Sequence, residues 1–205
     1  MQDDFATVLL KTDGLRVLVI GGGNVALRKC RNFKGAKIAV VAKDVLPELA
    51  SLASDVVLSE FNDAILNDVS ADIVIAATDD HGLNDAIVRD ATKRGLFINS
   101  AHGGGNVLIP SVLEREGYMV AVSSLGSAPA FPPFLVKELD RLLDERYDLM
   151  LRLLSEIRIY AKEVIPMEVD RRRCISSVVD SHEVMELVRN GEYEAALTVA
   201  KGMVR

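Results

Sequence analysis

The sequence of 205 residues has no tryptophan, few other aromatic side chains and only two cysteines. Cys30 and Cys174 stand far apart and outside metal-ligand spacing, so the sequence predicts neither a disulfide framework nor a zinc site. There is also no apolar run near the roughly 18 residues of a membrane span, and no N-terminal pattern of basic and then apolar residues. We therefore expect a cytoplasmic protein that has no membrane partner.

The chain also has fewer basic than acidic residues. Its 24 lysines and arginines and its 30 aspartates and glutamates give a net charge of -6. Nucleic-acid partners favour the opposite sign, so we expect no nucleic-acid binding. Apolar residues make up 49% and charged residues 26% of the chain, which is the balance of a globular protein. The length allows one sizeable core and an appended region.

What the sequence does have is a glycine cluster between two patterned segments. Residues 16–20 are an apolar run that predicts a strand, and residues 24–34 have the period of a helix. Between them, Gly21-x-Gly23-x-x-Ala26 fits a dinucleotide fingerprint: the first glycine permits the tight turn, the second lets the backbone approach a pyrophosphate, and the alanine lets helix pack on strand. This strand–glycine–helix context predicts a dinucleotide site, with an ordinary turn as the alternative.

Strands and helices alternate through the first half of the chain, which is typical of βαβ units around a parallel sheet. Right-handed crossovers would make the sheet doubly wound and place a ligand at the carboxyl ends of its strands. The strands are predicted at residues 16–20, 37–42, 56–60, 72–77 and 96–99, and the helices at residues 24–34, 46–54 (with Asp44 as its N-cap) and 83–94.

The pattern changes after residue 106. Two strands at residues 107–113 and 118–123 predict a hairpin, and helical periods then continue to the C-terminus with a break at Pro166. We expect an α/β protein with a Rossmann-like domain over residues 1–106, a linking ββα region over 107–145 and a helical domain over 146–205. The helices of the second half are predicted at residues 134–144, 147–164, 169–179, 182–189 and 192–203.

Several motifs, taken in order, resemble one family. They are Gly21-Gly22-Gly23-Asn24-Val25-Ala26-Leu27-Arg28-Lys29, Ala76-Ala77-Thr78-Asp79-Asp80 with Asn84, Ile98-Asn99, Ile109-Pro110-Ser111, Ser123-Ser124-Leu125-Gly126-Ser127-Ala128-Pro129 and Arg171-Arg172-Arg173. Over nearly the whole chain this order resembles the precorrin-2 dehydrogenase / sirohydrochlorin ferrochelatase family, the N-terminal module of siroheme synthases.

The resemblance implies NAD-dependent oxidation of precorrin-2 to sirohydrochlorin and, in some members, insertion of Fe2+ to make siroheme. It also implies a homodimer with a Rossmann domain, a dimerisation region and a C-terminal helical domain. NAD would be lined by Gly21, Gly22, Gly23, Asn24, Val25, Lys43, Asp44, Thr78 and Asp79, the last two beside the nicotinamide. Substrate contacts would fall on Asn99, Ser124, Ser127, Arg171 and Arg172.

Two positions depart from the family pattern. His102 stands where members carry the catalytic aspartate, and Ala128 stands where they carry a serine. An imidazole accepts protons near neutral pH, so His102 is the candidate catalytic base. The alternative is a polar residue in a flexible glycine loop and a weakened activity, because a neutral imidazole lacks the fixed charge of a carboxylate. One histidine is a poor metal site, so no metal site is predicted.

The end of the second strand leaves the form of the nicotinamide cofactor open. An acid about 20 residues past the glycines usually binds the adenosine ribose, but here Ala42 ends the strand and Asp44 follows two residues later. Asp44 either reaches the ribose or caps the next helix, and Lys43 would tolerate a 2′-phosphate. The resemblance favours NAD, with NADP as the alternative.

The arginines of the C-terminal region and the other two histidines can each be interpreted as structural or as functional residues. Arg171-Arg172-Arg173 either forms a solvated helix face or pairs with substrate carboxylates as bidentate forks. We expect His81 in the first turn of a helix beside acidic caps rather than in catalysis, and His182 at a solvated helix start.

The main prediction is therefore an NAD-dependent precorrin-2 dehydrogenase. The first alternative is a bifunctional enzyme that also inserts Fe2+ or Co2+ into sirohydrochlorin. The second is a non-catalytic homologue that binds a tetrapyrrole as a carrier or sensor. The third is an unrelated Rossmann dehydrogenase, against which the Ala-Ala-Thr-Asp-Asp motif counts.

Overall fold

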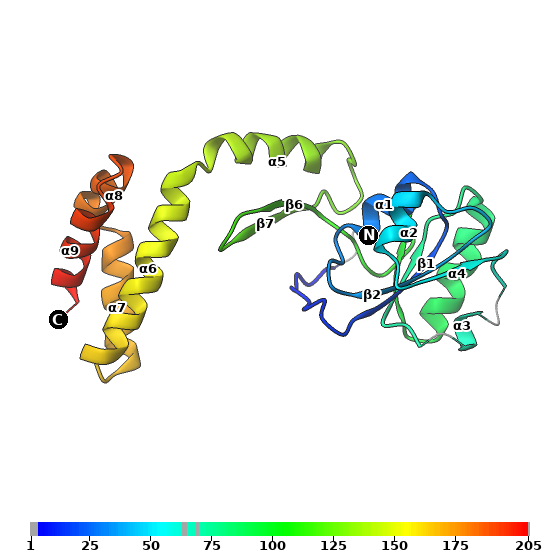
Figure 1. Ribbon diagram of the computed structural model, residues 1–205, viewed down its shortest axis with the longest axis horizontal. Coiled ribbons are helices and arrows are strands. Elements are labelled where there is room, and N and C mark those ends of the chain that lie inside the picture. Colours follow the sequence, from blue (N-terminus) through cyan, green and yellow to red (C-terminus); the bar gives the residue numbers. More distant parts are fainter. Residues whose placement is uncertain (1–3, 63–64, 69, 205) are drawn as a thin grey trace. The chain divides into compact units, whose positions relative to one another are not determined.

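The computed structural model describes residues 4–62, 65–68 and 70–204 of the chain. They fall into two compact units, Met1–Ile109 and Pro110–Arg205. The first holds a sheet flanked by helices, and the second holds a hairpin and the remaining helices (Figure 1). The boundary predicted at residues 145/146, inside the second unit, stays a prediction.

The first unit is built on a sheet of five strands in the order β3-β2-β1-β4-β5, in which every pair is parallel. This order confirms the predicted Rossmann-like fold, and it brings all the carboxyl ends to one edge of the sheet. The strands are β1 (Arg16–Ile20), β2 (Lys37–Ala42), β3 (Asp55–Leu58), β4 (Ile73–Ala76) and β5 (Phe97–Ser100). The helices are α1 (Asn24–Cys30), α2 (Pro47–Leu52), α3 (Ile65–Asp68) and α4 (His81–Lys93).

Alternate side chains of the central strands build a core on each face of the sheet. Val17 and Val19 of β1 pack with α1 and α2 on one face. Leu18 and Ile20 pack with α3 and α4 on the other (Figure 1). Burial on both faces explains why β1 and β4 are apolar almost throughout, as strands of a covered parallel sheet are.

Some boundaries differ from the predictions. The first helix ends at Cys30, and a turn with Gly35 at φ +82° leads to β2. The prediction that Asp44 caps the second helix is wrong: Leu46 is the N-cap, no side chain caps the helix, and Pro47 presets its first turn. The short helix α3 was not predicted because four residues carry too little of a helical period.

The second unit begins with the predicted hairpin, in which β6 (Ser111–Glu114) pairs antiparallel with β7 (Met119–Val122). The first hairpin strand starts later than predicted, because the Val107 N–H donates instead to the carbonyl of Ile98 in β5. The helices that follow are α5 (Phe131–Leu142), α6 (Glu145–Val164), α7 (Glu168–Val179), α8 (His182–Arg189) and α9 (Tyr193–Met203).

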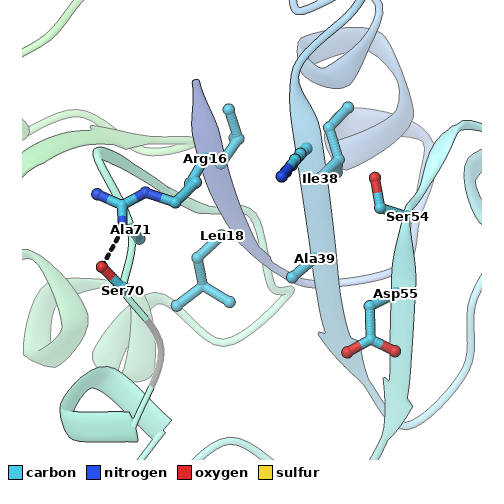
Figure 2. A pocket seen from close by; sticks show the side chains of 10 residues that line it. Arg16, Leu18, Ile38, Ala39, Ser54, Asp55, Ser70 and Ala71 are labelled. Carbon is cyan, nitrogen blue, oxygen red and sulfur yellow. Dashed lines mark hydrogen bonds between the residues drawn. The ribbon is translucent and has the colours of Figure 1, made fainter. Parts of the chain in front are cut away.

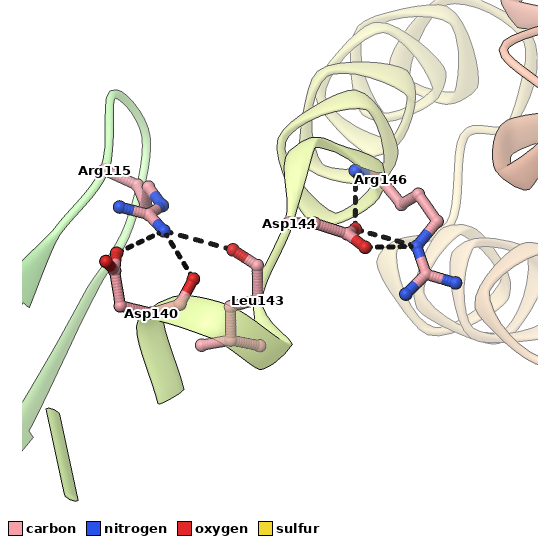
Figure 3. Close-up of polar contacts among 5 residues, drawn as sticks. All are labelled: Arg115, Asp140, Leu143, Asp144 and Arg146. Atoms are coloured by element: carbon pink, nitrogen blue, oxygen red, sulfur yellow. Dashed lines mark hydrogen bonds and ion pairs between the residues drawn. The ribbon is translucent and has the colours of Figure 1, made fainter. Parts of the chain in front are cut away.

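Arg115 in the hairpin turn hydrogen-bonds to the C-terminal end of α5 (Figure 3). Its guanidinium donates to Oδ1 of Asp140 at 2.7 Å and to the carbonyl oxygen of Leu143 at 3.1 Å. The last carbonyls of a helix lack partners within the helix, and a cation there also complements the negative end of the dipole. The hydrogen bond to Asp140 raises the pKa of Arg115. The hairpin and α5 are thus fixed to each other.

Helices α6 to α9 enclose a separate core. Leu153 and Ile157 of α6 are fully buried and pack with Val184 of α8 and Ala196 of α9. Across the described ranges of the chain, no helix combines the length and apolar character that crossing a membrane requires.

Candidate functional site

The glycine turn lies at the carboxyl edge of the sheet, between β1 and α1. Gly21 has a φ of +121°, which side chains rarely adopt, and a Cβ there would lie 2.2 Å from the carbonyl oxygen of Ala77. A Cβ on Gly22 would lie 1.8 Å from the carbonyl oxygen of Asp44. These two glycines therefore let the turn lie directly against the segments that follow β2 and β4.

Gly23 differs, because a Cβ there would meet no atom within 4 Å. It is the N-cap of α1, where no side chain caps the helix and no acidic residue stands in the first turn. The first N–H groups and the positive end of the helix dipole thus face open space, which is how helices bind phosphate. Asn24 and Val25 are exposed beside it, and Ala26 is fully buried against the sheet. A dinucleotide pyrophosphate fits this cradle.

Lys43 and Asp44 follow β2 beside the glycine turn, and both side chains are exposed. The Lys43 ammonium lies 2.6 Å from Oε1 of Glu60, which follows β3. This contact raises the pKa of Lys43 and lowers the pKa of Glu60. Glu60 was missed by the sequence reasoning, because its place beside Lys43 depends on the neighbouring positions of β2 and β3 in the sheet.

Thr78 and Asp79 follow β4, and Asn84 of α4 holds this loop. The fully buried amide of Asn84 donates to the carbonyl oxygen of Thr78 at 2.9 Å and accepts from the Thr78 N–H at 3.1 Å. A buried amide with its partners in place fixes the backbone around it. Asp79 remains exposed at the carboxyl edge.

Asn99 in β5 is buried, and both polar atoms of its side chain have partners. Its Nδ2 donates to the carbonyl oxygen of Val107 at 2.7 Å, and the ammonium of Lys29 donates to its Oδ1. Burial, with the neighbouring charge of Arg28, lowers the pKa of Lys29. Asn99 thus ties α1 to the segment after β5, and its contact with a substrate stays a prediction. Lys29 belongs to the motif that carried the resemblance, but it was not predicted as a site residue.

His102 lies in the loop after β5 and stacks on His81, the first residue of α4. The two ring centroids are 3.5 Å apart, and the ring planes are inclined by 22°. Both side chains are exposed. The carboxylate of Asp80 caps α4 by accepting from the Leu83 N–H at 3.0 Å, which confirms the predicted place of His81 in a helical turn beside an acidic cap. The stack brings the candidate base together with the end of β4.

Ser124 and Ser127 belong to the second unit, in the turn before α5. The Ser127 hydroxyl donates to the carbonyl oxygen of Ser124 at 2.6 Å, and Ser124 Oγ accepts from the Ala128 N–H at 3.2 Å. Both hydroxyls therefore stabilise the turn itself. Their contact with a substrate stays a prediction.

Arg171 and Arg172 belong to α7 of the second unit. Arg171 donates to the carbonyl oxygen of Ile165 at 2.8 Å, so its guanidinium closes the turn that precedes the helix. Arg172 is exposed and pairs with Glu168 at 2.8 Å. The pattern of a charged, solvated helix face accounts for this pair, and contact with substrate carboxylates stays a prediction.

A cavity of about 170 Å³ lies at the amino ends of the strands (Figure 2). Arg16 on its rim pairs with Asp72 at 2.6 Å and donates to Ser70. The glycine turn lies at the opposite edge of the sheet, so this cavity is not part of the dinucleotide site.

The cysteines offer no site chemistry. Burial raises the pKa of the Cys30 thiol to about 11, so that it stays protonated at neutral pH. Cys30 and Cys174 are both free. In the part of the chain that the structure describes, no group of three or more histidine, cysteine, aspartate or glutamate side chains is arranged to hold a metal ion.

The strand order, the glycine turn and the open helix end together define a Rossmann-type protein that binds NAD or NADP. A family model agrees with this class. Residues 8–111, just over half of the chain, match the NAD_binding_7 model, which is described as NAD(P)-binding.

Named relatives extend the similarity into the second unit. The chain is 34% identical over 201 residues to a siroheme synthase of Chromobacterium violaceum, a match that covers 94% of the chain and 42% of the synthase. It is 29% identical over 215 residues to a precorrin-2 dehydrogenase of Methanosarcina barkeri, with 98% of the chain and 94% of that protein covered. The chain thus spans less than half the length of several siroheme synthases that it matches, and nearly all of this dehydrogenase.

A solved structure has the same fold. It is that of SirC, a precorrin-2 dehydrogenase, with a TM-score of 0.74 and 25% identity over 95% of this chain and 99% of that one. The chain belongs to the family of precorrin-2 dehydrogenases and siroheme synthase N-terminal modules, and it carries the family's NAD(P)-binding domain. The resemblance drawn from the motifs is confirmed.

Proposed function

We propose that this chain is an NAD-dependent precorrin-2 dehydrogenase that makes sirohydrochlorin in siroheme biosynthesis. The observation that carries the proposal is the match with the Methanosarcina barkeri precorrin-2 dehydrogenase over 98% of this chain and 94% of that protein. The open cradle at Gly23, beside a helix end without an acidic residue, supports a bound dinucleotide.

Different residues of the chain would bind the cofactor and accept the proton. Bound NAD+ supplies the hydride acceptor. Residues 21–25 hold the pyrophosphate, and Thr78 and Asp79, fixed through Asn84, line the nicotinamide half. An imidazole nitrogen of His102 accepts the proton that leaves the macrocycle. Because the ring is exposed, it passes that proton on to solvent.

Substrate recognition is assigned to Asn99, Ser124, Ser127, Arg171 and Arg172. Arg172 is the most available of these, because an exposed pair such as that with Glu168 contributes little and exchanges readily for a substrate carboxylate. Arg171 would first have to leave the carbonyl groups that it binds.

A cytoplasmic homodimer completes the proposal. Phe131, Phe134 and Leu142 of α5 are 49%, 58% and 65% exposed, and the helical period places them on one side of the helix, which supports a partner there. Sedimentation of the wild type and of Phe134→Asp would test the dimer, since the charged variant is expected to sediment as a monomer.

The test of function is to mix the full chain with precorrin-2 and NAD+ and to follow the formation of NADH and of the sirohydrochlorin spectrum together. We expect both to appear in equal amounts. Tight binding of sirohydrochlorin without any NADH would contradict the enzyme and favour the carrier. The bifunctional alternative predicts that Fe2+ or Co2+ enters sirohydrochlorin faster with the protein than without it.

A further inference from the structure

The carboxyl end of β2 lacks the acid that usually selects NAD over NADP. In Rossmann domains an Asp or Glu there binds the ribose 2′-hydroxyl, whereas a nearby cation accommodates a 2′-phosphate. Here β2 ends in Ala42, and the next side chain is the cation of Lys43. By that rule alone, the chain would accept the phosphorylated cofactor.

The segment that carries Lys43 lies directly against the phosphate-binding turn. Gly22 is so close to it that a Cβ would lie 1.8 Å from the carbonyl oxygen of Asp44, and the Leu46 N–H donates to the Gly22 carbonyl oxygen at 3.0 Å. The backbone that carries Lys43 is therefore held next to the part of the site in which a doubly wound sheet places the adenosine ribose.

The ammonium group of Lys43 has an anionic partner. This group is 2.6 Å from the carboxylate of Glu60, and both side chains are largely exposed. The contact with Glu60, and more weakly the charges of Asp79 and Asp44, raise the pKa of Lys43. The positive charge of Lys43 is thus offset by nearby carboxylates, and a 2′-phosphate gains little attraction from it.

We propose that Glu60 is the residue that selects NAD over NADP, because its carboxylate pairs with Lys43 and offsets the positive charge that would otherwise attract the 2′-phosphate. Freed from Glu60, the Lys43 ammonium would pair with that phosphate in a charge-assisted hydrogen bond.

The inference rests on the NAD(P) site of the proposed function and not on the precorrin-2 reaction. Titration calorimetry of the full chain with NAD+ and with NADP+, without tetrapyrrole, tests cofactor binding separately from the precorrin-2 reaction. Glu60→Gln is expected to tighten NADP+ binding by about tenfold or more, the size of one hydrogen bond to a charged group. NAD+ binding should change by less than about threefold. The gain should vanish in Glu60→Gln/Lys43→Ala.

Glu138→Gln is the matched control, because it removes the carboxylate of an exposed ion pair with Arg141 in the second unit. It should alter binding of neither cofactor. An unchanged NADP+ affinity in Glu60→Gln would overturn the assignment, and so would a gain that survives in the double variant. Absence of binding by either cofactor in the wild type would overturn the dinucleotide site itself, whatever the outcome of the dehydrogenase assay.

Discussion

At the scale of single residues, the proposed chemistry depends on His102, which stacks on His81 at 3.5 Å between centroids. A loop followed by two glycines with positive φ, Gly103 and Gly104, holds a side chain loosely. The stack supplies the missing restraint, because two flat rings in contact limit each other's rotation.

His102→Ala is expected to lower the rate of precorrin-2 oxidation by about 100-fold or more, the usual contribution of a general base. His102→Asp should keep much of the activity, since a carboxylate also accepts a proton. The stack makes a further distinction: His81→Phe preserves a flat ring and should retain more activity than His81→Ala. An unaltered rate in His102→Ala would remove that residue from the mechanism.

Asp72 gives a pH dependence of stability. Its hydrogen bonds from Arg16 hold the pKa of its carboxyl at about 2, below the ordinary 3.8. A depressed pKa in the folded state stabilises the fold above pH 3.8, and this stabilisation is lost as the pH falls towards 2. We expect Asp72→Asn to lower the melting temperature above pH 3.8 and to match the wild type near pH 2. A difference that persists unchanged at low pH would refute this origin.

Residue contacts were the least predictable part of the site. The motif placed the tight turn at Gly21 and the buried small residue at Ala26, because both follow from the strand–turn–helix itself. The Lys43–Glu60 pair and the His81–His102 stack each join loops that follow different strands, so they depend on strand order and on loop conformation. No spacing pattern in the sequence predicts either contact.

At the scale of elements, we expect two glycines of the same turn to have different roles, Gly21 in the fold of the turn and Gly23 in cofactor binding. Gly21→Ala should lower the free energy of unfolding by about 1–3 kcal/mol, because φ is +121° and the new methyl meets the Ala77 carbonyl. Gly23→Ala should unfold close to the wild type and yet lose NAD+ affinity, because its methyl fills the open cradle. Urea titration and calorimetry measure the two effects. Equal losses of stability in both variants would contradict the distinction.

Most elements could be predicted from periodicity. β1 and β2 have the predicted bounds, because apolar runs of four and five residues, each preceded by a basic residue, favour buried strands between turn signals. The helix ends were harder, since Asp44 has the chemistry of an N-cap but Pro47 and the contact of its segment with Gly22 decide where α2 begins. Tertiary packing and Pro47, rather than the capping chemistry of Asp44, therefore set the start of α2.

At the scale of the whole molecule, two units with separate cores should respond separately to core mutations. Ile157→Ala in the helical core should cost about 2–5 kcal/mol and should leave NAD+ affinity unchanged. Ile75→Ala, equally buried in the sheet core, should cost a similar amount and weaken NAD+ binding near the unfolding midpoint. Urea titrations followed by circular dichroism and by NAD+ binding compare the two. A loss of NAD+ affinity in Ile157→Ala would show that the units are coupled.

The proposed reaction is the transfer of a hydride from precorrin-2 to NAD+. The most direct measurement is a single turnover, with enzyme in excess over precorrin-2 and with NAD+ either present or omitted. We expect one NADH for each sirohydrochlorin formed, and no sirohydrochlorin above the protein-free rate when NAD+ is omitted. Sirohydrochlorin without NADH, or neither product from a protein that binds NAD+, would contradict it.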